Sequence, residues 1–331
     1  MDGICTLAND RVYDQLVALL NSIEAIQGAE MPVCVYPYDN NTEHIAAEIA
    51  RRPNVQLYDY RDSIQKWDCF VGKIWDAHPT AYEHWQKIGS DKYYRVGTHR
   101  RYCAFDGPFD RFVYMDADTL LMSPLEQIFA QLNQSDWVVY DFQYKDLSHV
   151  YDINSAKLTK IFTTKQLQAE IFCSGFYASK KGIFNAQMQQ WLLEELQQGE
   201  AEVLYDMAPD QTILNYMVMR SGISSYNFAQ KLLESESTGC CVTSTHFQAK
   251  NHILYDKGNR LTYIHYIGLS SKLFSRLCAG ENIDFPYRDI FLYYRYLHEP
   301  DKQPKFNTKL KPYNTPPSLA TRILKKLAKL G

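Results

Sequence analysis

In the stretch Arg111-Phe-Val-Tyr-Met-Asp-Ala-Asp-Thr-Leu-Leu-Met122, an apolar strand pattern ends abruptly at two acidic residues, Asp116 and Asp118. Ligands of parallel sheets bind at the carboxyl ends of the strands. Two neighbouring carboxylates do not both stay charged in a partly buried crevice unless a cation neutralises them. Because hard carboxylate oxygens favour Mg²⁺ or Mn²⁺, the stretch predicts a divalent-cation site that serves a phosphate. The alternative is a turn in which both residues cap the following segment.

The first sixty residues predict alternating strands and helices. Residues 4–8, 33–36 and 55–58 are short apolar runs typical of buried strands, and residues 13–26 have apolar side chains at helical spacing. A second helix is expected from a cap near Thr42 to Pro53. This order implies a parallel sheet of nucleotide-binding type, an architecture that many functions share.

The later sequence adds strand candidates at residues 137–142, 172–178 and 261–267, and helix candidates at residues 187–198 and 210–220. Residues 61–98 are less regular and rich in aromatic side chains, which indicates an insertion. Its three tryptophans have two interpretations: they stack on an acceptor sugar, or they pack the insertion onto the core. These are Trp67, Trp75 and Trp85.

Three other sites carry chemistry that suits a metal-bound phosphate. A basic run at residues 99–101 precedes the acidic strand and offers a charge-assisted donor to a diphosphate, or forms a solvated turn. Asp210 and Gln211 follow a proline at a helix start, where an N-cap is the ordinary explanation for an aspartate. His265 follows a strand and is either a structural residue or a third metal ligand, and imidazole suits Mn²⁺ better than Mg²⁺.

At this point the sequence resembles the retaining glycosyltransferases of family 8, the group that contains glycogenin and galactinol synthase. Residues 112–122 and the following Pro124-Leu-Glu-Gln-Ile-Phe129 resemble the family's Asp-x-Asp region. Thr6-Leu7 with Tyr13 is similar to the first nucleotide-binding strand, and Phe172-Cys-Ser-Gly175 is similar to a Phe-Asn-Ser-Gly element. Asp210-Gln-x-x-Leu-Asn215 and His265-x-x-Gly268 complete five elements in the family's order, over roughly residues 4–275.

The resemblance implies a GT-A fold, an α/β architecture with a mostly parallel central sheet flanked by helices. It implies a retaining hexosyltransferase that uses a UDP-sugar donor and Mn²⁺ or Mg²⁺, and that transfers to a glycan, a glycolipid or another hydroxyl acceptor. The implied metal ligands are Asp116, Asp118 and His265, and the implied catalytic residues are Asp210, Gln211 and Arg100. The implied donor-binding residues are Thr6, Leu7, Ala8, Tyr13 (stacked on the uracil), Arg100, Ala117, Ser174, Gly175, Gly268 and Lys272.

The sequence departs from the family pattern at two places. Cys173 stands where the family has a pocket asparagine, so the transferred sugar is expected to differ from galactose or glucose. Lys272 falls one residue late after Gly268, and the following Pro-Trp is missing, which weakens its assignment to the diphosphate.

Three other functions compete with this interpretation. A haloacid-dehalogenase-type phosphatase also ends a strand with Asp-x-Asp, but Leu120 occupies the position that requires Thr or Val, and the motif lies more than a hundred residues from the N-terminus. A nucleotidyltransferase would need a glycine-rich phosphate loop, which residues 4–10 lack. A degenerate GT-A module that binds or scaffolds without catalysis is the third alternative, and the retained acids and histidine argue against it.

The composition is that of a globular protein: 331 residues, 46% hydrophobic and 22% charged, with no apolar run long enough to cross a membrane. The start of the sequence lacks the pattern of a signal peptide, and eight cysteines occur without the spacing of a zinc site or a disulfide framework. We therefore expect reduced thiols and a cytoplasmic protein.

The formal net charge of −3 is unevenly distributed. Eight basic and no acidic residues follow Asp301, which leaves the preceding body at −11 and argues against a nucleic-acid partner. We expect one domain over residues 1–300 and a basic tail over residues 301–331. Residues 318–330 predict a basic amphipathic helix that either binds an anionic membrane surface or docks on the acidic body or a partner.

Overall fold

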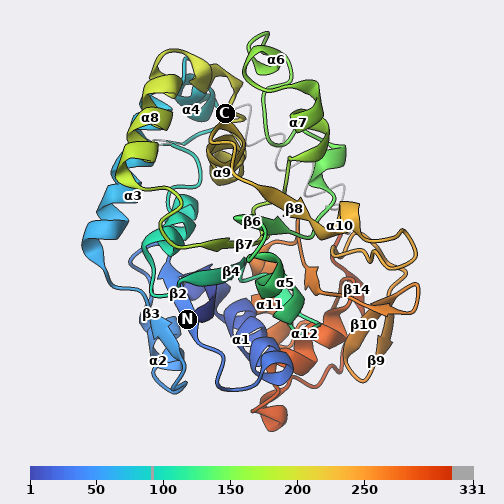
Figure 1. Ribbon diagram of the computed structural model, residues 1–331. Helices are drawn as coiled ribbons and strands as arrows, with labels where there is room; N and C mark the ends of the chain where they lie inside the picture. Colours follow the sequence, from blue (N-terminus) through green and yellow to red (C-terminus); the bar gives the residue numbers. More distant parts are fainter. Residues whose placement is uncertain (91–92, 315–331) are drawn as a thin grey trace, which may run out of the picture.

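The computed structural model describes residues 1–90 and 93–314, and its centre is a seven-stranded sheet with the order β3-β2-β1-β4-β7-β6-β8 (Figure 1). Only β7 runs antiparallel to its neighbours, so the sheet is mostly parallel. Its strands are β1 (Asp2–Ala8), β2 (Val33–Pro37), β3 (Val55–Leu57), β4 (Arg111–Met115), β6 (Trp137–Val139), β7 (Phe176–Lys180) and β8 (Ser225–Asn227).

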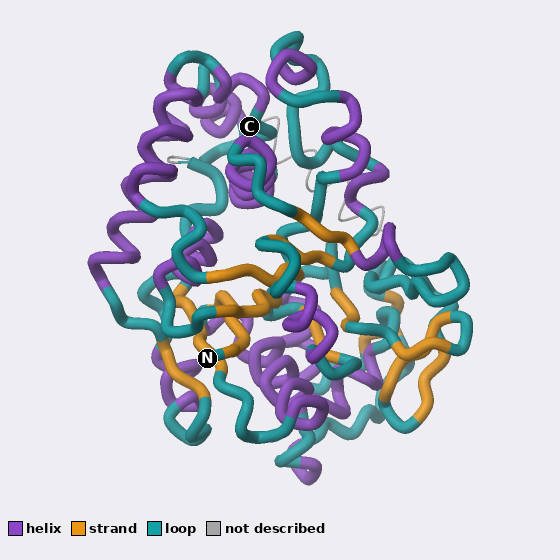
Figure 2. Tube along the Cα trace, in the orientation of Figure 1, coloured by secondary structure: helices purple, strands orange, loops and turns teal. Residues whose placement is uncertain are grey.

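Helices cover both faces of this sheet (Figures 1 and 2). One apolar core joins the sheet to α3 (Arg61–Ala77), α4 (Ala81–Lys87), α8 (Ala186–Gln197) and α9 (Pro209–Arg220). A second core on the other face joins it to α1 (Tyr13–Gln27), α2 (Glu43–Ile49) and α5 (Glu126–Gln131). Short helices α6 (Leu158–Ile161), α7 (Thr164–Ala169) and α10 (Phe228–Lys231) lie in the connections.

The expected order of the first five elements is confirmed. Helix α1 lies within one residue of its predicted bounds, and its buried side includes Leu16, Leu19, Leu20 and Ile23. Helix α2 follows Thr42 as expected, although the threonine hydroxyl makes no capping hydrogen bond. Apolar runs and apolar period were enough here because these signals are local in the sequence.

Residues 61–98 are more regular than the sequence indicated, because α3 and α4 occupy most of this segment. The indole rings of Trp67, Trp75 and Trp85 are 0% exposed and pack into the core on that face of the sheet. The packing interpretation is therefore confirmed, and the acceptor-stacking interpretation of these three residues is wrong.

A small antiparallel sheet crosses the end of the main one. It pairs β5 (Thr119–Leu121), directly after the acidic pair, with β12 (Tyr263–His265). Strand β7 begins at Phe176 rather than at residue 172, and β6 ends at Val139 rather than at residue 142. The register places His265 opposite Thr119, and this pairing brings two distant parts of the sequence together.

The C-terminal region packs against α1 through a third apolar core. It contains β9 (Gln248–Lys250), β10 (Ile253–Asp256), β11 (Asn259–Arg260), α11 (Ser271–Cys278), β13 (Ile283–Asp284), α12 (Arg288–Arg295) and β14 (Lys311–Pro312). Strand β14 pairs with β13, so the chain stays on the body at least to this point. The predicted helix at residues 318–330 lies outside the described residues.

The eight cysteines are free thiols, as their spacing indicated. Over residues 1–90 and 93–314, every helix is too short or too polar to cross a membrane.

Candidate functional site

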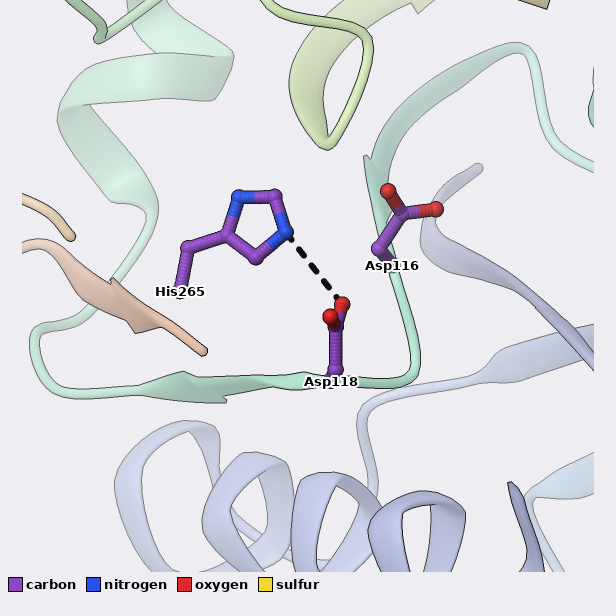
Figure 3. A group of neighbouring side chains, drawn as sticks. All are labelled: Asp116, Asp118 and His265. Atoms are coloured by element: carbon purple, nitrogen blue, oxygen red, sulfur yellow. Dashed lines mark ion pairs between the residues drawn. The ribbon is translucent and has the colours of Figure 1, made fainter. Parts of the chain in front are cut away.

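Asp116, Asp118 and His265 converge at the end of β4 (Figure 3). Each offers one ligand atom, and these atoms lie within 4.8 Å of one another. The His265 Nε2 atom is 3.2 Å from Asp118 Oδ1. The structure thus brings together the three residues that were singled out as a metal site in the sequence.

Backbone pairing holds the three side chains in place. The Asp116 amide donates to the Gly175 carbonyl over 2.9 Å, and the Thr119 hydroxyl donates to the Asp116 carbonyl over 2.7 Å. The Tyr266 amide donates to the Asp118 carbonyl over 2.9 Å, and the His265 amide donates to the Cys240 carbonyl over 2.7 Å. Because the main chain is fixed on each side, the ligand atoms are arranged before any ion binds.

This donor set fits a divalent cation. Two carboxylate oxygens and one imidazole nitrogen form a mixed site of the kind that suits Mn²⁺. Burial would raise the pKa of Asp118, but the neighbouring His265 outweighs burial and lowers that pKa overall. Burial raises the pKa of Asp116, although the charge of Arg101 opposes the rise. Two clustered carboxylates in these surroundings are the arrangement that a cation stabilises.

Gly175 leaves the space that the His265 ring occupies. A Cβ atom on this residue would lie 2.9 Å from His265 Nδ1 and 3.1 Å from Asp116 Oδ2. Its backbone has no left-handed conformation, so the need for glycine is steric.

We expect Gly175→Ala to weaken Mn²⁺ binding about tenfold or more, because the methyl group pushes both ligands out of position. Titration calorimetry with Mn²⁺ measures the change. Gly72→Ala on α3 is the matched control, since an added Cβ there meets no atom within 4 Å. Equal Mn²⁺ affinity for Gly175→Ala and the unmodified protein would contradict the site.

The basic residue beside the acids is Arg101, not Arg100. Both lie on the 3-10 helix η2 (Thr98–Asp106), in which successive residues point about 120° apart. Arg100 makes a bidentate pair with Asp68, at 2.9 and 3.1 Å, and does not line the cleft. The predicted position was one residue early because the sequence does not show the rotational phase of a short 3-10 helix.

Arg101 is buried and bridges two carboxylates. Its Nη2 atom lies 3.1 Å from Asp116 Oδ1 and 3.0 Å from Asp210 Oδ2. Its Nη1 atom donates to the Ser174 carbonyl over 2.9 Å, and the guanidinium lies 4.9 Å from the centre of the Tyr114 ring. One cation therefore couples the metal-site acid to the acid on α9.

Asp210 and Gln211 lie at the start of α9 and hold the segment before β7. Ser174 donates its hydroxyl to Asp210 Oδ2 over 3.2 Å, and its amide donates to Gln211 Oε1 over 3.2 Å. Burial raises the pKa of Asp210, but the charges of Arg101 and Arg95 together with its hydrogen bonds lower that pKa overall, which favours the ionised form.

A cleft of about 280 Å³ opens in front of these residues. Its lining includes five predicted residues, Leu7, Ala8, Asp116, Ala117 and Asp118. It also includes Arg101 from the predicted basic run, and residues that the sequence did not single out, among them Asn9, Arg11, Gln15, Tyr38 and Arg95. Ser174, Asp210 and His265 form the buried layer behind this lining.

Seven of the ten predicted donor-binding residues are not in this lining. Arg100, Ser174 and Gly175 are described above, and the remaining four are Thr6, Tyr13, Gly268 and Lys272. Tyr13 faces away: its hydroxyl donates to Glu48 over 3.3 Å, and the Arg295 guanidinium lies 5.4 Å from the centre of its ring. The structure therefore does not place Tyr13 to stack on a base in the cleft, because the first turn of α1 directs its side chain toward α2 and α12.

The positions of Thr6, Gly268 and Lys272 follow from the strand, turn and helix in which each residue lies. Thr6 is fully buried within β1. Gly268 adopts a φ of 81°, which favours glycine in the turn after β12. Lys272 is exposed in the first turn of α11, next to the cleft residue Ser271.

Asp141 is a buried acid that the sequence analysis did not identify. It is 3% exposed, its Oδ1 accepts from the Gln143 amide over 2.7 Å, and its Oδ2 has no hydrogen-bond partner. Burial raises the pKa of Asp141 to about 7. An acid at the end of a predicted strand was the available signal, since Asp116 was found in that way.

We expect Asp141→Asn to flatten the pH dependence of stability in the metal-free protein. Folding raises the pKa of this carboxyl, so its contribution is fully present below pH 3.8 and is lost as the pH rises to about 7. The rise in the pKa of Asp141 corresponds to a change of about 4 kcal/mol at most in the free energy of unfolding. Urea unfolding from pH 4 to 8 in EDTA measures the free energy of unfolding at each pH. If this free energy changes with pH in the same way for the variant and the unmodified protein, the prediction is wrong. Asp289→Asn, at a side chain that is 89% exposed, is the control.

Proteins similar to this chain were found among solved structures. No protein-family model matches the sequence, and no curated protein matches it significantly. The apo structure of the bifunctional glycosyltransferase WbbM has a TM-score of 0.56 at 14% identity, over 91% of this chain and 51% of that one. The chain thus spans about half the length of WbbM.

The galactosyltransferase LgtC, in complex with donor and acceptor sugar analogues, has a TM-score of 0.51 at 17% identity, over 88% of this chain and 100% of LgtC. A Gln-to-Glu active-site mutant of LgtC matches over the same shares of both chains at 15% identity and a TM-score of 0.51. Membership of family 8 stays a prediction. The chain has the GT-A glycosyltransferase fold, a mixed α/β architecture with a mostly parallel central sheet, as the sequence predicted.

Proposed function

We propose that this protein is a retaining hexosyltransferase that moves a sugar from a UDP-sugar donor to a hydroxyl group of a glycan or glycolipid, with Mn²⁺ as its cation. The observation that carries the proposal is the convergence of Asp116, Asp118 and His265 at a strand end, beside a cleft that the end of β1 also lines. The fold supports it, since LgtC is a galactosyltransferase that was solved with donor and acceptor analogues.

Asp116, Asp118 and His265 would hold the cation, which when bound supplies a Lewis acid for the diphosphate. In the proposed reaction the bond from the sugar C1 atom to the diphosphate oxygen breaks, and a bond from C1 to the acceptor oxygen forms on the same face. The acceptor proton passes to the departing phosphate oxygen. Negative charge therefore builds on the diphosphate, and fixed cations beside it lower the barrier.

The contacts of Asp210 favour an electrostatic role over that of a covalent nucleophile. Its Oδ2 atom is engaged by both Arg101 and Ser174, and the residue is only 5% exposed. A fixed negative charge at this place would stabilise positive charge on the sugar ring. Gln211, which holds the Ser174 amide, would shape the sugar pocket from the same helix.

A second cavity of about 810 Å³ is our candidate for the acceptor. Cys241, which lines it, forms a β-bridge with His265, and Phe142, also in the lining, follows Asp141 in the chain. The basic segment at residues 318–330 would bring a glycolipid acceptor within reach if it binds an anionic membrane surface.

The test is thermal unfolding in the presence of a panel of UDP-sugars, with and without Mn²⁺. A donor that binds the folded protein raises the melting temperature by mass action, and the rise should require Mn²⁺. Donor hydrolysis with the stabilising sugar then separates an enzyme from a degenerate binding module. Absence of any Mn²⁺-dependent shift across the panel would refute the proposal.

A further inference from the structure

Two arginine side chains at the cleft lack partners. Arg11 and Arg95 both line it, and within residues 1–90 and 93–314 neither guanidinium group makes a hydrogen bond or an ion pair. By contrast, Arg101 in the same cleft is fully used by Asp116, Asp210 and backbone carbonyls. A cation that stands free at a concave site is available to a ligand.

The backbone fixes where Arg95 stands. Its φ is 55°, an uncommon conformation for a residue other than glycine, and its carbonyl accepts from both the amide and the hydroxyl of Thr98, over 3.2 and 2.9 Å. Gly97 has a φ of 101°, and a Cβ there would collide with the Tyr38 carbonyl. Such a conformation costs about 1–3 kcal/mol and persists where the surroundings enforce it.

The nearby acids leave Arg11 free. Asp10 Oδ1 accepts from the Ile45 amide over 3.0 Å. The two oxygens of Asp39 accept from Asn41 and Asn9, each over 2.9 Å. Arg11 therefore lies on the short 3-10 helix η1 (Asp10–Val12), just before α1, with its neighbouring carboxylates already engaged.

Arg11 and Arg95 both act electrostatically on Tyr38, which lines the cleft. The pKa of Tyr38 is raised, mainly by burial, and both Arg95 and Arg11 oppose the rise. Arg11, Arg95 and Tyr38 belong to the lining of the same cleft, so both guanidinium groups are open to one ligand.

The balance of charged side chains at the cleft favours a ligand with two negative charges. Asp116, Asp118 and Asp210 are matched in number by Arg11, Arg95 and Arg101. A bound divalent cation would then leave two positive charges, which the two negative charges of a sugar-linked nucleoside diphosphate would neutralise. Lys272, the lysine expected at the diphosphate, is exposed and does not line the cleft.

We propose that Arg11 and Arg95 form an anion subsite that binds the diphosphate of the donor and takes the place of the displaced lysine. The subsite rests on the proposed function, because a nucleoside diphosphate is the anion it would receive. Both arginines share the cleft lining with Asp116 and Asp118, which are two of the proposed metal ligands.

The experiment is calorimetric titration of the full chain with UDP, uridine and inorganic pyrophosphate, each with Mn²⁺, for Arg11→Gln, Arg95→Gln and the double variant. We expect each single variant to lose about 10- to 100-fold in affinity for UDP and pyrophosphate, with no change for uridine. Arg51→Gln, whose side chain is 71% exposed and paired with Glu48, is the matched control and should bind like the unmodified protein.

The outcomes separate the two proposals. If UDP binds the unmodified protein and all three variants equally, the anion subsite is refuted and the donor assignment stands. If pyrophosphate binding depends on Arg11 and Arg95 but UDP does not bind, the subsite stands and the donor assignment fails. If neither ligand binds the unmodified protein, both are refuted. Melting temperatures that match across the variants show that folding is intact.

Discussion

Asp118→Asn lowers donor turnover at least about a hundredfold, which is the scale for loss of one preorganised electrostatic group. Asparagine keeps the shape of the side chain and the backbone pairing around it, in which the Tyr266 amide donates to the carbonyl of residue 118. The change removes one negative charge from a site whose ligand atoms lie within 4.8 Å of one another. Affinity for the cation and the rate of transfer should therefore fall together.

The measurement pairs Mn²⁺ titration with the initial rate of donor hydrolysis at saturating donor. Asp289→Asn, at an exposed side chain on α12, is the control for loss of an aspartate charge and should keep both values. Near-native hydrolysis by a purified, folded Asp118→Asn variant would remove the metal assignment. A drop in rate with unchanged Mn²⁺ affinity would equally count against it.

Arg101→Gln costs about 3–5 kcal/mol of stability and abolishes measurable transfer. The side chain is 5% exposed and compensates both Asp116 and Asp210, so its removal leaves the buried Asp210 and the partly buried Asp116 without their cation. The pKa of Asp210, which Arg101 holds down against burial, then rises. Arg101→Lys restores the charge but not the fork of donors, so we expect an intermediate loss.

Urea unfolding and donor hydrolysis measure these effects, and the neighbouring Arg100→Gln is the comparison. Arg100 pairs with Asp68 away from the cleft lining, so its loss should leave hydrolysis within a few-fold of the unmodified protein. Should Arg100→Gln abolish hydrolysis while Arg101→Gln spares it, the assignment made from the structure would be reversed.

The sequence predicted much of the fold because many of its signals are local. The period of α1, the apolar runs of β1, β2 and β4, and the acids after β4 all lie within short windows. The same reasoning missed α3 in residues 61–98, although its buried Trp67, Phe70 and Ile74 recur at helical spacing. It also extended β7 too early, because Phe172 is as apolar as a strand residue.

The site was predicted less completely. No local pattern favoured Arg101 over Arg100, since the two differ only in rotational phase on a 3-10 helix. Tyr13 was expected at the base, yet its ring packs beneath Arg295 from α12. Such contacts join residues far apart in the chain, and no local pattern encodes them.

By itself, the sequence determined the nucleotide-binding type of sheet, the acidic pair at a strand end and the identity of the histidine that would join it. Only the tertiary structure decided that β12 pairs with β5, and hence that His265 reaches Asp118. It also decided which arginine is buried between two acids and which two stand free at the cleft. The physical reason is that apolar periodicity fixes each element alone, whereas long-range packing fixes which polar groups meet when water is removed from between the elements.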